Sequence, residues 1–245
     1  MSTTRFLPTR RAFSTTICLT TVVGYQLVSV PAGWSVFTPT FKDVGGTDFD
    51  LKDVVPCDAS GNVLTSSKNK ITVQKLSADG SLLVSYSYTT ASNKGWHLNN
   101  VAISKGDVVF ADGEGIAVNN VSGSALTFRV AGAVDLVCRN VIPTGWSFSG
   151  NSTPVRVDLK NIVPCDATGT PLTSSKNKIT VQKLGTEGSF DLSYSFTTAS
   201  NKGWHLNNVA INEGEVVFEP GEAFGINNVS GAVVILQLPS PVTNN

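Results

Sequence analysis

The chain has only two histidines, His97 and His205, and each lies in the same short block, Gly-Trp-His-Leu-Asn-Asn. A tryptophan beside a histidine and paired asparagines could form a sugar-binding platform, because aromatic rings stack on pyranose faces while amide groups bond sugar hydroxyls. The residues of this predicted platform are Trp96, His97, Asn99, Asn100, Trp204, His205, Asn207 and Asn208. Two platforms on one chain would make the protein bivalent. The alternative interpretation places each tryptophan in the core, at the end of a β-sandwich.

These histidines do not support a familiar hydrolase or a zinc site. A serine hydrolase of the α/β type carries a Gly-x-Ser-x-Gly elbow, and the chain contains no such sequence. A zinc site needs several closely spaced His or Cys ligands, which the sequence also lacks. We therefore predict a protein that is not an enzyme and that uses neither a metal nor a cofactor.

The four cysteines are an even number, which permits disulfides. Cys57 and Cys165 are equivalent, because each follows Val-Pro. Cys138 and Cys165 could join neighbouring strands in an oxidising compartment. Cys18 could pair with Cys57 in the same way if the N-terminal segment is retained.

Both histidine blocks belong to a long internal repeat with an offset of 108 residues. Leu64–Leu76 recurs letter for letter as Leu172–Leu184, and Thr89–Ile103 recurs as Thr197–Ile211. A repeat of this length predicts the tandem duplication of a whole domain. The predicted parts are a targeting segment or N-terminal arm (1–23), a first unit (24–132) and a second unit (133–245).

Apolar and polar residues alternate with a period of two, which is typical of half-buried strands. Val84, Tyr86 and Tyr88 are expected to face the core, with serines between them on the other face. No window of a dozen residues shows helical periodicity. Strands with one apolar face need a second sheet to cover it, so we predict an all-β fold with two tandem β-sandwich or jelly-roll-like domains. Trp34 and Trp146, each at the start of a strand, are expected in the core.

The overall charge excludes some partners. Lys plus Arg and Asp plus Glu number 18 each, so the net charge is zero. The chain has no basic field that would attract nucleic acid or anionic lipid. We expect the partners to be further copies of the chain, joined by strand addition at sheet edges or through an extended N-terminal arm, or surface glycans.

The N-terminal segment predicts targeting rather than a part of the core. It contains Arg5, Arg10 and Arg11, no acidic residue, and an apolar run too short to span a bilayer. Thr9-Arg10-Arg11 is similar to a twin-arginine export signal, whereas Arg11-Ala-Phe-Ser14 is similar to a mitochondrial cleavage site. A general secretory signal is a third interpretation, although the segment has no evident Ala-x-Ala cleavage site. We predict an extracellular or cell-surface location without a transmembrane segment. Mitochondrial import and a retained arm are the alternatives.

Two motifs resemble those of a group of secreted bacterial surface proteins. Gly24–Ser35 is similar to their opening strand, Val-Gly-Tyr followed by Val-Pro-Ala-Gly-(Phe/Trp)-Ser. Phe218–Asn228 is similar to their Pro-Gly-Glu-Gly-Phe-x-Val-x-Asn segment, and Ala111–Asn119 carries a weaker form of it. The resemblance implies export and a β-sandwich repeat, and it implies no activity.

The sequence therefore predicts a non-enzymatic, exported structural or adhesive surface protein that self-assembles into a fibre, layer or matrix. The alternative is a bivalent carbohydrate-binding module that uses the repeated Gly-Trp-His-Leu-Asn-Asn loop.

Overall fold

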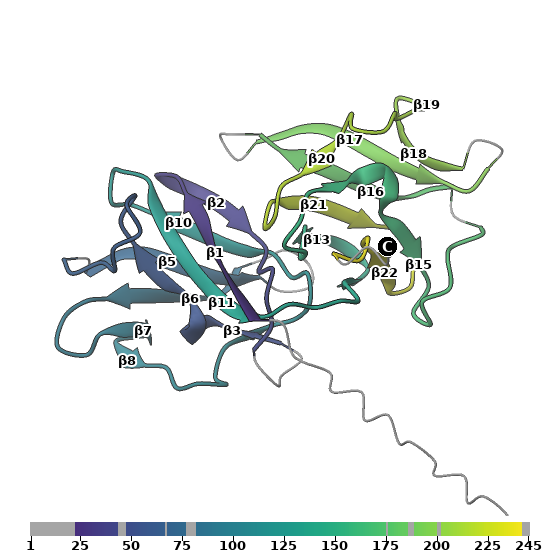
Figure 1. Cartoon of the computed structure of the whole chain (residues 1–245). Helices are drawn as coiled ribbons and strands as arrows, with labels where there is room; N and C mark the ends of the chain where they lie inside the picture. The colour runs from purple at the N-terminus through teal and green to yellow at the C-terminus, as the bar shows by residue number, and fades with distance from the viewer. Residues whose placement is uncertain are drawn as a thin grey trace, which may run out of the picture.

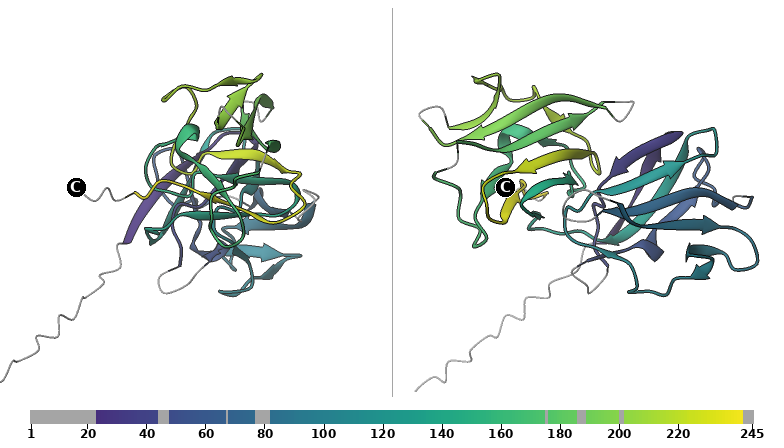
Figure 2. Two further views of the ribbon diagram at one scale, coloured as in Figure 1. Left: turned by 90° about the vertical axis from the view of Figure 1, so that its right-hand side faces the viewer. Right: turned by 180° about the vertical axis from the view of Figure 1, so that it is seen from behind.

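A computed structural model describes residues 23–43, 48–66, 68–76, 82–174, 176–185, 189–199 and 202–241. Within this part of the chain, two β-sheet units lie beside one another, as Figure 1 shows from the front and Figure 2 from the side and from behind. The helices described there are two 3-10 turns, η1 (Leu51–Asp53) and η2 (Leu159–Asn161). Neither is long and apolar enough to cross a membrane.

The first unit consists of a six-stranded sheet and a three-stranded sheet. Its strands are β1 (Val23–Val30), β2 (Gly33–Phe37), β3 (Phe49–Asp50), β4 (Val55–Cys57), β5 (Lys68–Leu76), β6 (Leu82–Thr89), β7 (Gly95–Leu98), β8 (Val101–Ala102), β9 (Val109–Phe110), β10 (Ile116–Asn120) and β11 (Leu126–Ala133). The large sheet has the order β2-β10-β5-β6-β7-β8, and the small sheet has the order β1-β11-β4. Strands β3 and β9 form a separate pair.

The second unit repeats this order strand by strand. Its strands are β12 (Arg139–Ile142), β13 (Gly145–Gly150), β14 (Val157–Asp158), β15 (Val163–Cys165), β16 (Lys176–Leu184), β17 (Phe190–Thr197), β18 (Gly203–Leu206), β19 (Val209–Ala210), β20 (Val217–Phe218), β21 (Ala223–Asn228) and β22 (Val234–Gln237). The sheets run β13-β21-β16-β17-β18-β19 and β12-β22-β15. The predicted all-β, sandwich-like fold is confirmed, and an origin by duplication stays a prediction from the sequence.

Each unit has its own core between its two sheets. In the first unit, Phe37 of β2 packs edge to face on Phe128 of β11, with ring centroids 5.7 Å apart. Ile71 and Val73 of β5 are fully buried on the same side, while Thr72 between them faces outward. The period-two alternation read from the sequence therefore describes these strands correctly.

A buried asparagine ties together the end of each large sheet. The Asn228 side-chain amide donates hydrogen bonds to three backbone oxygens, among them those of Ile142 at 3.3 Å and Ala232 at 2.8 Å. Its side-chain oxygen accepts from the backbone N–H and the hydroxyl of Ser230. Asn120 makes the same contacts in the first unit. Although each Asn-Val-Ser sequence has the form of a glycosylation acceptor, its amide nitrogen is engaged inside the protein.

The units meet through two equivalent turns. The carbonyl of Gly221, between β20 and β21, accepts a hydrogen bond from the backbone N–H of Thr38 at the end of β2. In return, the carbonyl of Gly113 accepts from the Ser149 hydroxyl of β13 at 2.8 Å. Gly113 has a φ of +71°, and a Cβ there would overlap Asn140, so only glycine fits. Equivalent turns of the two units thus contact equivalent strands, β13 and β2, of the opposite unit, as at a two-fold interface.

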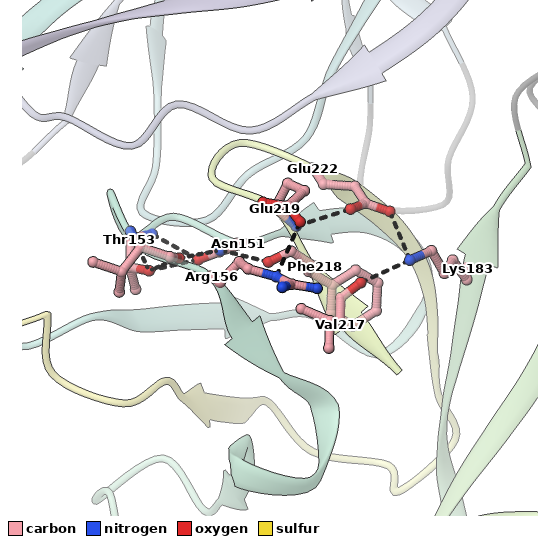
Figure 3. A network of polar contacts seen from close by, with 9 residues as sticks. Asn151, Thr153, Arg156, Lys183, Val217, Phe218, Glu219 and Glu222 are labelled. Carbon is pink, nitrogen blue, oxygen red and sulfur yellow. Dashed lines mark hydrogen bonds and ion pairs between the residues drawn. The ribbon is translucent and has the colours of Figure 1, made fainter. Parts of the chain in front are cut away.

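Charged side chains brace the turn of the second unit, as Figure 3 shows. Lys183 Nζ lies 3.2 Å from Glu222 Oε1 and donates to the Val217 oxygen at 2.7 Å. Glu222 Oε2 accepts from the Glu219 N–H, and Glu219 pairs with Arg156 at 3.0 Å. The Pro-Gly-Glu motif is therefore a braced turn at the contact between the units.

A lysine links the units at the point where the chain passes between them. Lys42 Nζ lies 2.5 Å from a carboxylate oxygen of Asp112 in the first unit and 2.7 Å from one of Asp135, which precedes β12. Burial by itself would lower the pKa of Lys42, but the hydrogen bonds to both carboxylates raise it above its ordinary value. The lysine therefore stays charged and holds the two segments together.

Replacing Asn228 with alanine should lower the free energy of unfolding by about 2–4 kcal/mol, because buried backbone oxygens would lose their donors. Urea unfolding followed by circular dichroism measures this loss. Asn161→Ala, at an exposed position, serves as the control and should change stability by less than about 0.5 kcal/mol. Equal stability of the two variants would contradict the role assigned to Asn228.

Candidate functional site

The tryptophans of the predicted sugar platform lie in the core. Trp96 of β7 and Trp204 of β18 are each only 2% exposed. The Trp96 ring N–H donates to the Val54 oxygen at 3.0 Å, and the Trp204 ring N–H donates to the Ile162 oxygen at 2.9 Å. These bonds satisfy the indole nitrogen inside the protein. The rings are therefore unavailable for stacking on a ligand, which corrects the platform prediction and agrees with the core interpretation.

The asparagines of the same block form hairpin turns. Asn99 and Asn100 join β7 to β8 with φ angles of +51° and +66°, and Asn207 and Asn208 join β18 to β19 with +50° and +66°. Two consecutive residues with positive φ are typical of a type I′ turn, and asparagine tolerates this geometry better than most residues. The turn is thus sufficient to explain these four residues, whose side chains are exposed.

The histidines lie on the other face of the sheet from the tryptophans. His97 and His205 are 5% and 4% exposed. Their Nδ1 atoms lie 2.9 Å and 3.1 Å from the backbone oxygens of Gly95 and Gly203. Because consecutive residues of a strand point to opposite faces, a tryptophan and the histidine after it cannot line one platform.

The described cysteines are buried free thiols. Cys138 immediately precedes β12 and Cys165 lies in β15, and β22 runs between these two strands. Strands two positions apart in a sheet are separated by roughly 9–10 Å, which exceeds the reach of a disulfide. The structure therefore contradicts the predicted Cys138–Cys165 bridge. Cys18 lies outside the described residues.

No metal site is found in the described part of the chain. There, no three His, Cys, Asp or Glu side chains lie close enough together to hold an ion.

Two other tryptophans, expected in the core, lie at the surface. Trp34 of β2 is 52% exposed, and Trp146 of β13 is 42% exposed. Phe37 is buried three positions after Trp34, so the two rings point to opposite faces of β2. The strand register places Trp34 opposite Asn119 and Trp146 opposite Asn227, on the outer face of each large sheet. The expectation of core tryptophans here was wrong, because a tryptophan at the start of a strand does not reveal which face it occupies.

A second surface feature is the open edge of β1, the outermost strand of its sheet. Val23, Tyr25 and Leu27 are 63%, 72% and 51% exposed. They alternate with residues that face inward, so they form an apolar stripe along the strand. We call this stripe, together with Ser29, the β1 edge.

Backbone geometry shows which groups the β1 edge presents. Ala133 of β11 exchanges two backbone hydrogen bonds with Lys42, so its N–H and C=O point away from β1. Its register partner Val23 must then point its own N–H and C=O away from β11. Because the backbone groups of every second residue point the same way, the N–H and C=O of Tyr25, Leu27 and Ser29 also point away from β11. None of these groups has a hydrogen-bond partner among the described residues.

No protein-family model matches this chain, and neither a curated protein nor a solved structure matches it.

The thiol of Cys138 should make stability depend on pH. Burial, followed by the nearby charge of Asp135, raises the pKa of Cys138 to about 12. Between the unfolded pKa of about 8.5 and this value, the unfolded chain releases a proton that the folded chain keeps. Stability should therefore fall with rising pH, by up to about 1.4 kcal/mol per unit.

Urea unfolding of the wild type and of Cys138→Ala at several pH values between 7 and 10 tests this effect. The variant should lose less stability over this range than the wild type does. Identical pH slopes would contradict the assignment. A reducible link between Cys138 and Cys165 in the folded protein would contradict the strand order described above.

Proposed function

We propose that this chain is a non-enzymatic, exported structural or adhesive surface protein that associates with itself through the β1 edge. The observation that carries this proposal is the combination, on one strand, of three exposed apolar side chains and four residues whose outward backbone groups have no partner among the described residues. Exposed strand edges of this kind are templates for another strand.

Proteins usually protect an edge strand with charged residues, proline, bulges or short length. β1 has none of these protections, because it reads Val-Gly-Tyr-Gln-Leu-Val-Ser-Val and pairs with β11 over all eight residues without a bulge. The equivalent strand of the second unit, β12, has only four residues and begins with Arg139. The two units therefore differ at the edge that controls association.

The occupant that fits the β1 edge best is β1 of a second copy, paired antiparallel about a two-fold axis. With the axis at Gln26, Tyr25 lies opposite Leu27 of the second copy and Val23 lies opposite Ser29. Each of these four residues then donates one N–H and accepts at one C=O, so the four residue pairs across the axis form eight hydrogen bonds in total. The strand carries no charge and the chain has no net charge, so two copies do not repel each other.

The energy balance indicates a reversible contact. Eight hydrogen bonds contribute roughly 4–12 kcal/mol net, which is similar to the cost of association of about 4–15 kcal/mol. The apolar contacts of Tyr25 and Leu27 then decide whether the dimer forms. A two-fold contact closes on itself, so growth to a fibre or layer requires a further contact.

Tyr25→Lys/Leu27→Lys should abolish self-association, because two lysines would face two lysines across the strand pair. Sedimentation velocity over a concentration series measures the dimer of the full chain. The matched control is Val137→Lys/Val141→Lys, at exposed positions beside and within β12, which should dimerise like the wild type. A wild type that stays monomeric at its highest soluble concentration, or a double variant that dimerises normally, would overturn the proposal.

Export is supported by the acid-free, arginine-containing N-terminal segment and by the resemblance to secreted surface proteins. We expect the protein from its native host to lack the residues before β1, with a cut near residue 23. Intact mass spectrometry gives the cleavage point. A cut near Arg11 would favour mitochondrial import instead, and an uncut chain would contradict export.

A further inference from the structure

We propose that the outer face of each large sheet binds an extended, neutral polysaccharide. The strand registers align six side chains in one row across each sheet. In the first unit the row is Trp34, Asn119, Thr72, Ser87, His97 and Ala102. In the second unit it is Trp146, Asn227, Thr180, Ser195, His205 and Ala210. The two rows have the same six residue types in the same order.

The rows agree although core positions on two of the strand pairs, β10/β21 and β6/β17, differ between the units, whereas β5/β16 and β7/β18 are identical at every position. Core-facing Ile116 of β10 is replaced by Phe224 in β21, and core-facing Tyr88 of β6 is replaced by Phe196 in β17. The outward-facing asparagine and serine on these strands are unchanged. An outer-face position that is not fully buried carries less packing constraint than a core position, so the identity of Asn119 and Ser87 with their counterparts supports a shared ligand. His97 and His205 lie on the same face but are buried.

The chemistry of the rows matches sugar rather than a charged ligand. Trp34 and Trp146 are about half exposed and offer indole rings for stacking on pyranose rings, and the Trp146 ring lies 6.1 Å from the ring of Phe190. Asparagine, threonine and serine then supply neutral donors and acceptors for hydroxyl groups. No member of either row carries a fixed charge, and Lys70 and Lys178, two positions before the row threonines, can donate to hydroxyls as well.

Two oxygens on these faces lack a donor among the described residues. They are Asn227 Oδ1, beside Trp146, and Gln74 Oε1, two positions after Thr72 on β5. The Gln74 amide nitrogen is already used, because it donates to Ser85 at 3.0 Å. A buried acceptor without a hydrogen bond lowers the stability of the folded protein. A sugar hydroxyl would donate to this oxygen once the side-chain amide turns toward the surface.

The length of the rows favours a chain of several sugars over a single residue. Six strands spaced by about 4.8 Å extend over about 24 Å, with the tryptophan at one end. Small side chains, such as Thr72 and Ser87, occupy the middle of the row, which suits a polymer lying across the strands better than a single sugar end group. An extended chain that lies across the strands uses this surface best.

Isothermal titration calorimetry of the full chain tests the inference with four neutral hexasaccharides: cellohexaose, xylohexaose, mannohexaose and chitohexaose. At least one should bind at two sites per chain. Trp146→Ala should leave one site, and Trp34→Ala/Trp146→Ala should weaken binding at least tenfold, since stacking and burial of an indole contribute about 1.4 kcal/mol or more. The exposed matched control, Val101→Ala/Val209→Ala, should bind like the wild type.

Three outcomes would overturn the inference. They are no binding of any neutral hexasaccharide, unchanged binding by the double tryptophan variant, and binding only of an acidic oligogalacturonate that salt abolishes. Circular dichroism and the urea midpoint verify that the variants are folded. Tyr25→Lys/Leu27→Lys should bind the glycan normally, because β1 belongs to the other sheet, so glycan binding and self-association are tested separately.

Discussion

A strand can place only every second side chain in the core, and the arrangement of both units depends on this constraint. In β7 it sends Trp96 inward and therefore His97 outward. In β2 the burial of Phe37 forces Trp34 to the surface. The residues that look like one recognition block in the sequence are thus divided between two faces, and residues from six separate strands are brought into one row.

The contact between the two units is built from one structural element, a tight turn, that each unit contributes. The turn before β10, which contains Gly113, contacts β13 of the second unit. The turn before β21, which contains Gly221, contacts the residue after β2 of the first unit. Lys42 and Lys183 hold the surrounding segments by ion pairs with partly buried carboxylates. A contact fixed in this way keeps the two outer faces in a constant relation, which is the geometry that bivalent binding to a repeating polymer requires.

The two units nevertheless differ at the edge of the small sheet. β1 is long and uncharged and has no neighbour on one side among the described strands, whereas β12 is short and begins with Arg139. Self-association through β1 would therefore use one edge per chain and leave four outer faces exposed on a dimer. Structural and adhesive roles are compatible in such an assembly, because the association edge and the outer faces lie on different sheets.

The sequence alone was sufficient to predict an all-β fold, because alternation such as Tyr86 and Tyr88 with serine is a local property of a strand. The repeat was also readable from the sequence. The turn at Asn99 and Asn100, where positive φ favours asparagine, was instead assigned to a sugar-binding platform. Tertiary structure alone decided that Trp96 is buried and Trp34 exposed, since each strand had two possible faces and the packing of Phe37 and of Trp96 against Phe128 chose between them. It also separated Cys138 from Cys165 by inserting β22, because the order of strands in a sheet depends on long-range pairing that residue spacing does not encode.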